Sequence, residues 1–424
     1  MQDNEKKPAL RFKGFTDPWE QRKLTNLCEK FTDGDWIEAK DQSDSGVRLV
    51  QTGNVGVTEY LDKPNNKKWI SFETFEQLHC EEVYPGDILI SRLPEPAGRA
   101  CIMPNLGTKM ITAVDCTIVR PNAVTSTRFL LQYLSSQAYF DAVNTCLAGG
   151  TRQRISRGNL AQFNVPIPSS KIEQEKIGEV LEKLDTLITL HQRKYEKLVN
   201  IKKSMLDKMF PKNGASVPEI RFKGFTDPWE QRKLGELVDR VVRKNTNNES
   251  TLPLTISAQY GLVDQITYFN NRVASRDVSN YYLVLNGEFA YNKSTSDGYP
   301  FGAVKRLDLY EKGVLSTLYI VFAPKKEQQI DSDYLTVFFD TDRWHKGVAE
   351  RAAEGARNHG LLNISAEDFF DIDLSVPKDI VEQKQIGAFI RQLDNLITLH
   401  QRKPFLMKWR TSDANRNQTN RLVL

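Results

Sequence analysis

The segment Arg11–Leu24, RFKGFTDPWEQRKL, occurs a second time, letter for letter, as Arg221–Leu234. A second matching pair follows at nearly the same offset: EQEKIGEVLEKLDTLITLHQRK at Glu173–Lys194 and EQKQIGAFIRQLDNLITLHQRK at Glu382–Lys403. The repeat far exceeds the periods of about 20 to 50 residues that indicate solenoids and propellers. The chain is therefore predicted to contain two copies of one large structural frame, produced by duplication.

The residues between the repeated segments differ between the two halves. Each half begins with the repeated opening, continues through its own insert, residues 25–165 or 235–377, and ends in the second repeated segment. Two unlike inserts in one frame would allow a protein to read two different signals, so we expect the inserts to carry specificity. The predicted organisation is a first domain at residues 1–170, a helix at 171–211, a second domain at 212–379, and a distal helix with an atypical tail at 380–424.

In the two matching segments that start at Glu173 and Glu382, mostly apolar residues recur in alternating steps of four and three. This spacing is the pattern of a coiled-coil seam. Because the two helices are chemically alike and a pseudo-two-fold axis would relate the halves, we expect them to pack antiparallel. At about 1.5 Å per residue, the first helix would span about 54 Å, longer than the roughly 34–36 Å of one duplex turn. The seam positions are Ile177, Leu181, Leu184, Ile188, His191, Tyr195, Leu198, Lys202, Met205 and Met209 in the first copy, and Ile386, Ile390, Leu393, Ile397 and His400 in the second.

Histidines occupy equivalent positions of the two seams, at His191 and His400. One interpretation is a pH-sensitive or register-setting layer, since the charge of histidine changes near neutral pH. The other interpretation is a partly solvated histidine in a long helix. We favour the second from the sequence.

Both inserts mix short β-rich runs with turns and then with helical stretches. This mixture predicts an α+β domain in each half, with a sheet and one or two helices. The predicted strands are Asp87–Ser91, Val114–Val119, Glu288–Tyr291 and Leu315–Phe322, and the predicted helices lie near Arg128–Thr145 and Tyr334–Ala353.

A glycine-containing polar loop precedes the last strand of each domain, at Gly149–Ser156 and Gly355–Ser365. Arginine can pair bidentately with guanine, and asparagine or glutamine with adenine, while glycine lets a phosphate backbone approach. A solvated turn could have the same composition, but recurrence at matching positions makes DNA contact an equal alternative. The candidate DNA-binding residues are Thr151, Arg152, Gln153, Arg154, Arg357, Asn358 and His359 in the loops, and Arg92, Arg99, Asn292, Lys293, Ser294, Thr295, Lys305 and Arg306 elsewhere.

Composition limits the class of protein. With 40% apolar and 26% charged residues over 424 positions, the chain has the composition of a globular protein of two or three domains. It has no apolar run of membrane length and no signal-peptide core, so we expect a cytoplasmic protein. The net charge of +4 does not by itself establish a polyanion partner. The five cysteines have no C-x-x-C spacing, so neither a zinc site nor a disulfide framework is predicted.

The motifs that resemble catalytic ones are incomplete. Asp17-Pro18-Trp19 lacks the second proline of the D-P-P-W motif of amino methyltransferases, and Glu38-Ala39-Lys40 lacks the Pro-Asp partner of a nuclease site. A G-x-x-x-x-G-K-S/T loop, which would bind ATP, is absent from the sequence. We therefore expect no catalytic residue, metal or cofactor in this chain.

Several segments together match one known family over nearly the whole chain. They are the repeated opening, the strand Val165–Pro168 with the helix start Glu173–Asp185, and the second copies Val376–Pro377 and Glu382–Asp394. With these segments the chain resembles the specificity subunits of type I restriction-modification enzymes. The resemblance implies two target-recognition domains in a pseudo-two-fold repeat, separated by two long antiparallel coiled-coil helices. It also implies sequence-specific binding to double-stranded DNA with a bipartite target.

The same resemblance implies partner subunits. Two modification (methyltransferase) subunits, and optionally two restriction (translocase-nuclease) subunits, would carry N6-adenine methylation and ATP-dependent cleavage. S-adenosylmethionine, ATP and Mg²⁺ would then belong to those partners. One departure from the family pattern is the polar tail that begins at Pro404, where we expect proline to end the second helix. The alternative function is a coiled-coil interaction or scaffold protein without DNA recognition, which salt-dependent binding to duplex DNA would separate from the first.

Overall fold

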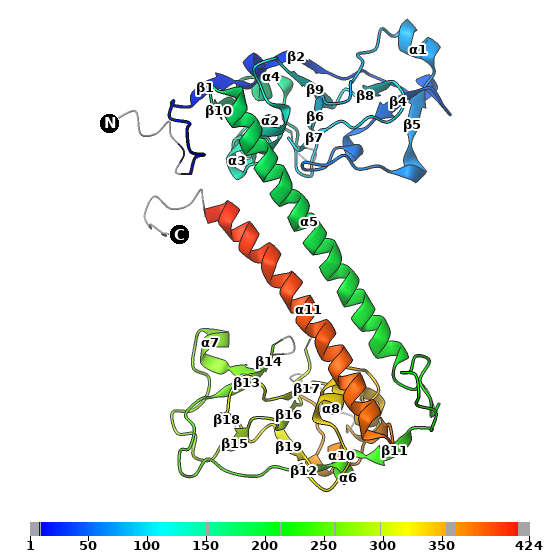
Figure 1. Ribbon diagram of the computed structural model, residues 1–424, viewed down its shortest axis with the longest axis vertical. Helices are drawn as coiled ribbons and strands as arrows, with labels where there is room; N and C mark the ends of the chain where they lie inside the picture. Colours follow the sequence, from blue (N-terminus) through cyan, green and yellow to red (C-terminus); the bar gives the residue numbers. More distant parts are fainter. Residues whose placement is uncertain are drawn as a thin grey trace. The chain divides into compact units, whose positions relative to one another are not determined.

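The chain divides into two compact units. Unit 1 comprises Met1–Leu190 with Met407–Leu424, and unit 2 comprises His191–Leu406; Figure 1 shows the elements of each. The computed structural model describes residues 8, 10–149, 153–212, 214–257, 260–296, 298–352 and 361–413, with side chains described as far as residue 401.

Unit 1 is an α+β domain whose described strands form two four-stranded sheets and one two-stranded sheet. The first sheet has the order β2-β9-β6-β7 and is antiparallel throughout, and the second has the order β3-β5-β4-β8, with β4 and β8 parallel. The strands are β1 (Glu20–Lys23), β2 (Cys28–Asp33), β3 (Gln42–Ser43), β4 (Val47–Val50), β5 (Lys68–Ile70), β6 (Ile88–Ser91), β7 (Ala100–Ile102), β8 (Met110–Thr112), β9 (Cys116–Pro121) and β10 (Asn164–Ile167). The helices are α1 (Phe72–Gln77), α2 (Thr127–Tyr133), α3 (Gln137–Thr145), α4 (Arg157–Ala161) and the start of α5 (Lys171–Lys208).

Unit 2 is also an α+β domain. Its described four-stranded sheet has the order β12-β19-β16-β17, and three two-stranded sheets pair β11 with β20, β13 with β14, and β15 with β18. The strands are β11 (Glu230–Lys233), β12 (Val238–Arg240), β13 (Leu254–Ser257), β14 (Gly261–Asp264), β15 (Tyr282–Leu285), β16 (Phe289–Asn292), β17 (Ala303–Arg306), β18 (Lys312–Leu315), β19 (Ile320–Pro324) and β20 (Asp373–Val376). The helices are α6 (Leu234–Leu237), α7 (Gln265–Phe269), α8 (Ser332–Phe339), α9 (His345–Arg351), α10 (Ala366–Phe370) and α11 (Ile380–Asp413). Unit 2 includes α11 as far as Leu406 and also the end of α5, from His191 onward.

The two units share one topology beyond the repeated letters. In each, the strand after the repeated opening pairs with the last strand before a pair of helices. That strand pairs with a third strand, which pairs with a fourth, giving β2-β9-β6-β7 and β12-β19-β16-β17. In each, two helices, one short helix and one strand then lead into a long helix. The predicted pair of α+β domains on a duplicated frame is confirmed, and the duplication extends into the inserts.

The repeated opening forms the same two-stranded ladder in both units. Strand β1 pairs antiparallel with β10, with Glu20 opposite Ile167, and β11 pairs antiparallel with β20, with Glu230 opposite Val376. Each ladder ties the start of a domain to the strand that precedes the long helix. This pairing gives a structural reason for the repetition of EQRK.

A cluster of polar contacts fixes the first turns of each long helix. In unit 1, Arg11 donates through Nε and Nη2 to the carboxylate of Glu173, at 2.7 and 2.8 Å. In unit 2, Arg221 makes the same two bonds to Glu382, at 2.7 and 2.8 Å. Both carboxylates are buried, where a charge without a partner would be costly. We use the name helix-start clusters for these ion pairs together with one glutamine and one glycine of the same helix, Gln174 and Gly178 in α5 and Gln383 and Gly387 in α11.

The glutamine and glycine of each cluster attach the helix to its own domain. Gln174 accepts a hydrogen bond from the backbone N–H of Ser126 (2.8 Å), and Gln383 accepts one from Asp331 (2.8 Å). A Cβ at Gly178 would lie 2.8 Å from the backbone N of Phe129, and a Cβ at Gly387 would lie 3.0 Å from that of Tyr334. Only glycine allows the helices α2 and α8 to approach this closely.

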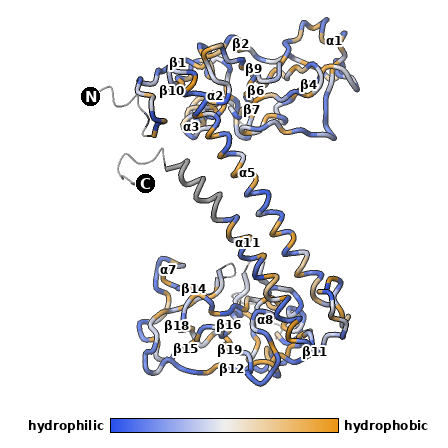
Figure 2. Tube along the Cα trace, in the orientation of Figure 1, coloured by the Kyte–Doolittle hydropathy of each residue, from blue (hydrophilic) through white to orange (hydrophobic). Residues whose placement is uncertain are grey.

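Within unit 2, the C-terminal half of α5 packs antiparallel to the part of α11 between Ile380 and His400. The Nδ1 atoms of His191 and His400 lie 2.8 Å apart, and Lys202 Nζ lies 2.7 Å from Asp394 Oδ1. Residue numbers rise along one helix as those of the contacting residues fall along the other, so the predicted antiparallel pairing is confirmed in this unit. The hydropathy colours of Figure 2 alternate along α5, as expected for a helix with an apolar stripe.

The predicted seams are buried to different extents. In the second copy, Ile386, Ile390 and Leu393 are buried in the core of unit 2 and Ile397 packs against that core. In the first copy, Ile177 packs against the core of unit 1. Leu181, Leu184 and Ile188 of that copy are partly exposed. Farther along the same helix, Leu198 is buried in the core of unit 2, as is Met209 after the helix, and Met205 packs against that core.

Three local predictions were wrong. The run Leu315–Phe322 is not one strand: β18 ends at Leu315 and β19 begins at Ile320, because Ser316 forms a turn in which its carbonyl accepts from the N–H of Tyr319 (3.2 Å). The two predicted helices are each split. Ser136 starts α3 as an N-cap whose hydroxyl accepts from Tyr139 N–H, and α8 and α9 are likewise separate. Serine favours both turns and caps because its hydroxyl competes for backbone groups.

Helix α11 does not end at Pro404 but continues to Asp413. Proline removes its own backbone N–H from the helical ladder and crowds the preceding turn. In α11 the helix continues across that single missing donor.

Candidate nucleic-acid interface

In unit 1, five charged side chains meet beside the last turn before α4. Asp33 ends β2, Arg92 follows β6, Asp115 lies in the turn before β9, and Arg154 and Arg157 flank the start of α4. The backbone holds them together, because Arg92 N–H donates to the carbonyl of Asp115 (2.9 Å) and the carbonyl of Arg92 accepts from the N–H of the residue after Arg154 (3.1 Å). We call this group the arginine cluster.

Arg92 is the buried member of the arginine cluster, with 7% of its surface exposed. Its Nη2 donates to the carbonyl of Val114 (2.6 Å), and its Nε lies 3.5 Å from Asp33 Oδ1. That Nε makes no hydrogen bond with any described residue. Arg92 therefore places a partly satisfied positive charge beneath the two other arginines.

Arg154 and Arg157 are the exposed members. Their side chains are 60% and 45% exposed, and each lies 3.7 Å from a carboxylate, Asp115 for Arg154 and Asp33 for Arg157. These separations exceed hydrogen-bond distance, so both guanidinium groups keep donors for another acceptor. Gln153, beside Arg154, is also exposed.

Arg157 and the exposed Trp36 were not predicted as site residues. Arg157 is the third arginine of the sequence TRQRISR, and this recurrence was a usable signal. Trp36 follows the end of β2 at Asp33, and only the fold brings that end to the arginine cluster. An isolated tryptophan is more often part of the core, so the sequence offered little to identify it.

Arg99 lies inside unit 1. Its guanidinium donates to the backbone carbonyls of Val55 (2.7 Å), Leu93 (2.7 Å), Pro96 (3.0 Å) and Thr52 (2.9 Å). Burial lowers the pKa of this guanidinium. Its donors stabilise loops of the domain, so we leave it out of the proposed DNA contacts.

The basic residues predicted on β17 make ion pairs within unit 2. Arg306 lies 2.7 Å from Asp308 and 2.8 Å from Asp333, and Lys305 lies 2.7 Å from Asp340. Burial opposes ionisation of Asp340, but Lys305 and Lys202 outweigh it and lower the pKa of that carboxyl. These contacts attach the sheet to α8, and we leave both basic residues out of the proposed DNA contacts as well.

The remaining predicted residues of unit 2 lie together at the end of β16. Ser294 bridges antiparallel to Leu361, and Lys293 accepts at its carbonyl from the N–H of Leu362 (3.0 Å). Asn292 and Thr295 are the neighbours of this pair, and the side chain of Asn292 accepts from the N–H of Ser294 (3.0 Å). The structure thus places Asn292–Thr295 beside residues 361–362 of the predicted polar loop. Thr151, Arg152, Arg357, Asn358 and His359 lie outside the described residues.

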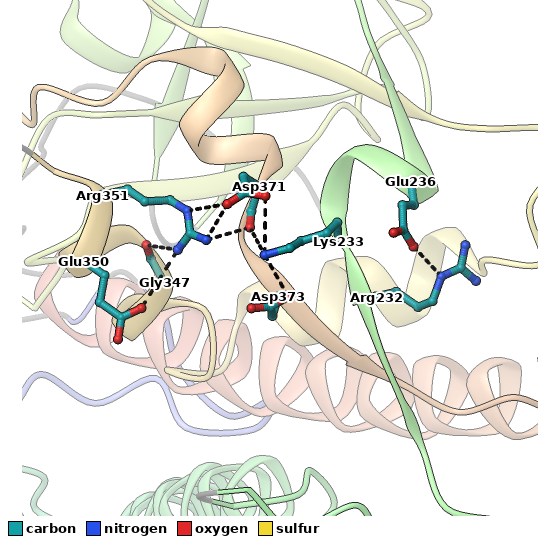
Figure 3. A network of polar contacts seen from close by, with 8 residues as sticks. All are labelled: Arg232, Lys233, Glu236, Gly347, Glu350, Arg351, Asp371 and Asp373. Atoms are coloured by element: carbon teal, nitrogen blue, oxygen red, sulfur yellow. Dashed lines mark hydrogen bonds and ion pairs between the residues drawn. The ribbon is translucent and has the colours of Figure 1, made fainter.

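A polar network fixes α9, the helix that precedes the same loop (Figure 3). Arg351 lies 2.6 Å from Asp371, which also lies 3.3 Å from Lys233, and Lys233 lies 3.1 Å from Asp373. Hydrogen bonds from Arg351 and then from Lys233 lower the pKa of the Asp371 carboxyl. The network links the end of α9 to β11 and to the start of β20. Its two cations are compensated by carboxylates.

Across the described ranges, no group of three or more His, Cys, Asp or Glu side chains is placed to hold a metal ion. None of the described helices combines the length and the apolar character needed to cross a membrane.

Comparison with known proteins gives one consistent match. Residues 16–200 and 226–405 each match the type I restriction modification DNA specificity domain. A putative type I restriction enzyme specificity subunit from Methanocaldococcus jannaschii is 22% identical over 232 residues, and the match spans 52% of each protein, about half the length of that relative. The crystal structure of a type I restriction-modification S subunit from M. genitalium has a TM-score of 0.60 at 12% identity, covering 98% of this chain and 100% of that one. This last similarity concerns the fold.

Proposed function

The chain belongs to the type I restriction modification DNA specificity domain family, and we propose that it reads a bipartite target in double-stranded DNA, with one half-site for each α+β domain. The observation that supports this most strongly is the contrast between frame and inserts. The helix-start clusters of the two units are identical in chemistry and distance, whereas the arginine cluster occurs only in unit 1 among the described residues. Two different surfaces on one duplicated frame fit two different half-sites.

In unit 1, we assign DNA contact to the arginine cluster. The exposed guanidinium groups of Arg154 and Arg157 can bind phosphate oxygens or the O6 and N7 atoms of guanine, and Gln153 can pair with adenine. Arg92 adds a buried positive charge to the same cluster. Trp36, three residues after the end of β2 at Asp33, is exposed and provides an apolar surface for a thymine methyl group or a sugar.

In unit 2, we assign DNA contact to Asn292–Thr295 and to the loop that ends beside them. The side chains there carry an amide, an ammonium and two hydroxyl groups, which are the kinds of group that bind phosphates or base edges. The partners of Lys293 and Asn292 are backbone groups, so their contacts involve no carboxylate that would compete for DNA.

The partners follow from the duplicated frame. A frame that presents the same residues twice offers the same surface twice, so two copies of one modification (methyltransferase) subunit are expected per chain. Two restriction (translocase-nuclease) subunits would join optionally. In this proposal, N6-adenine methylation, ATP-dependent cleavage, S-adenosylmethionine, ATP and Mg²⁺ belong to those partners, and this chain supplies no catalytic group.

Selection from a random duplex pool tests the proposal. The full chain, assembled with its modification subunits, is expected to retain duplexes that share two short fixed blocks separated by an unread spacer. Retention should fall steeply with salt, because bound phosphates release counterions. Retention that is independent of salt and enriches no sequence would instead support a coiled-coil scaffold without DNA recognition.

A further inference from the structure

Unit 2 carries an exposed segment that its core does not explain. Helix α7 and the residues after it, as far as Arg276, follow the two-stranded sheet β13-β14 (Figure 1). Tyr268 and Phe269 are 47% and 50% exposed, and Ile266 and Val273 are exposed as well. Large apolar side chains that gather on one short exposed segment commonly mark an interaction surface.

Local hydrogen bonds give the segment a defined shape. Asp264 accepts from the N–H of Ile266 (2.9 Å), and Gln265 Oε1 accepts from the N–H groups of Val273 (3.2 Å) and Ala274 (2.7 Å). Asn270 adopts a left-handed conformation, with φ of 51°, and turns the chain at the end of α7. The segment is therefore held by its own polar groups while its apolar side chains remain outside.

The two aromatic rings form a unit on this surface. Tyr268 and Phe269 lie edge to face, with ring centroids 4.9 Å apart. The pair gathers two apolar rings at one exposed place, and aromatic side chains bury a large apolar area when they are covered by a partner.

The arginines of the segment lack acidic partners. Arg272 donates to the backbone carbonyls of Ala274 (3.3 Å) and Ser275 (3.0 Å), and among the described residues neither Arg272 nor Arg276 forms an ion pair with a carboxylate. The nearby Asp277 accepts instead from the N–H of Ser279 (2.9 Å). Lys305, Arg306 and Arg351 of the same unit are all paired with carboxylates, so this segment differs in its charge.

We propose that Tyr268–Arg276 is a second DNA contact of unit 2, in which Arg272 and Arg276 bind backbone phosphates and the Tyr268–Phe269 pair packs against a base step from the minor groove. Proteins that bind there combine arginine and asparagine with apolar side chains that enter between base steps. Asn270 and Asn271, between the rings and the arginines, supply that amide chemistry. The uncompensated positive charge favours a polyanion over an apolar protein partner. This inference rests on the proposed function.

Two double variants test the inference in the chain assembled with its modification subunits. The probe is a duplex that carries the motif selected by the parent complex. Arg272→Ala/Arg276→Ala should weaken binding and reduce the slope of log affinity against log salt by about 1.8, since each phosphate contributes about 0.9. Tyr268→Ala/Phe269→Ala should leave the slope unchanged, weaken binding by about tenfold or more, and lower the fluorescence of 2-aminopurine placed at the contacted step in the bound duplex.

The controls are exposed residues of the same unit outside the segment, Lys326→Ala for charge and Leu318→Ala for apolar surface. Both should bind as the parent does. Parent-like binding and slope in both double variants would overturn the inference while leaving the proposed function intact. Variants that bind DNA normally but no longer assemble with modification subunits would also overturn it, because the surface would then belong to a protein partner. A parent complex without salt-dependent binding would overturn the proposed function itself, and the inference with it.

Discussion

The two units begin their long helices in the same way, but they differ in the residues available to cover the repeated tryptophan. In unit 2, Trp229 is only 4% exposed, because Phe210 at the end of α5 packs edge to face on it, with centroids 5.8 Å apart. The corresponding position of the second copy is Thr419, and in unit 1 the equivalent Trp19 is partly exposed.

The two copies differ in a second residue of this helical segment, at Lys202. Lys202 of α5 lies 3.2 Å from Asp340 and 2.7 Å from Asp394, whereas Thr411 stands at its position in the second copy and Asp185 of unit 1 accepts a hydrogen bond from Gln132 (2.8 Å). The comparison separates two sources of stability. The helix-start clusters are equal in the two units, whereas the residues that make these contacts at the far end of α5 in unit 2, Lys202 and Phe210, are replaced by threonine in the second copy.

The largest effect is expected from Phe210→Ala. The side chain is buried and also packs on Tyr334 and Phe338, so its loss should lower the free energy of unfolding of unit 2 by about 3–5 kcal/mol. Hydrogen exchange measured on peptides of β11 and β20 should accelerate, while peptides of β1 and β10 should be unchanged. Thr419→Ala is the matched control and should change neither set. Equal acceleration of hydrogen exchange in both units would contradict the claim that Phe210 stabilises unit 2 alone.

The next effect should be equal in the two units. Arg11→Ala and Arg221→Ala each leave a buried carboxylate, Glu173 or Glu382, without its partner, at a cost of about 3 kcal/mol in the affected unit. A second change of that glutamate to glutamine should recover part of the loss, since no buried charge then remains. Chemical denaturation of the single and double variants measures both quantities. A clear difference between the two single variants would show that the helix-start clusters are not equivalent.

Lys202→Thr gives the first helix the residue that the second copy has at this position. We expect the free energy of unfolding of unit 2 to fall by about 1.5–3 kcal/mol, the range of hydrogen bonds to charged groups. The effect should depend on pH. Because Lys305 and Lys202 outweigh burial and lower the pKa of Asp340, the stabilisation is complete above the ordinary aspartate pKa of about 3.9 and is lost as the pH falls through the lowered value. The deficit of the variant should therefore be largest near neutral pH and shrink in acid. A deficit that grew toward acid would contradict this origin.

The smallest effects are expected at the arginine cluster, which unit 2 lacks in its described part. Arg154→Ala and Arg157→Ala should each weaken DNA binding by about 1 kcal/mol and reduce the salt slope by about 1 if they bind phosphate. Arg128→Ala, which removes an exposed arginine paired with Glu182 (3.1 Å), serves as the control. If Arg154 or Arg157 instead contacts a base, its replacement by alanine should make one position of the selected motif less specific. Unchanged binding and motif in both variants would exclude the arginine cluster.

The repeat predicted the frame well because identical segments placed in the same frame can make the same backbone pairing and the same buried ion pair. The ladder of EQRK and the pairing of Arg221 with Glu382 are consequences of letters that can be read twice in the chain. The inserts were harder to predict, because their strands are short and many are held by partners far along the sequence. Strand β6, for example, pairs with β9 and β7, and only its apolar run was visible from the sequence.

The candidate DNA-binding residues could be predicted only in part. An arginine has the same chemistry on a DNA-binding surface and inside a domain, and only the acceptors around it distinguish the two. Arg99 points its donors at four carbonyls of its own domain, and Arg306 is paired with two aspartates, whereas Arg154 keeps free donors. Those acceptors come from segments distant in sequence, so the local pattern could not separate Arg99 from Arg154.

The most direct test of the central claim, one half-site for each domain, is an exchange of inserts. Residues 25–165 are replaced by the corresponding insert of another family member, the frame is kept, and the methylated motif of the assembled complex is mapped by sequencing modified bases. We predict that one half-site changes while the other half-site and the spacer stay the same, and that replacing residues 235–377 gives the reciprocal result. A change in both half-sites after either exchange, or an unchanged motif in an active complex, would contradict the claim.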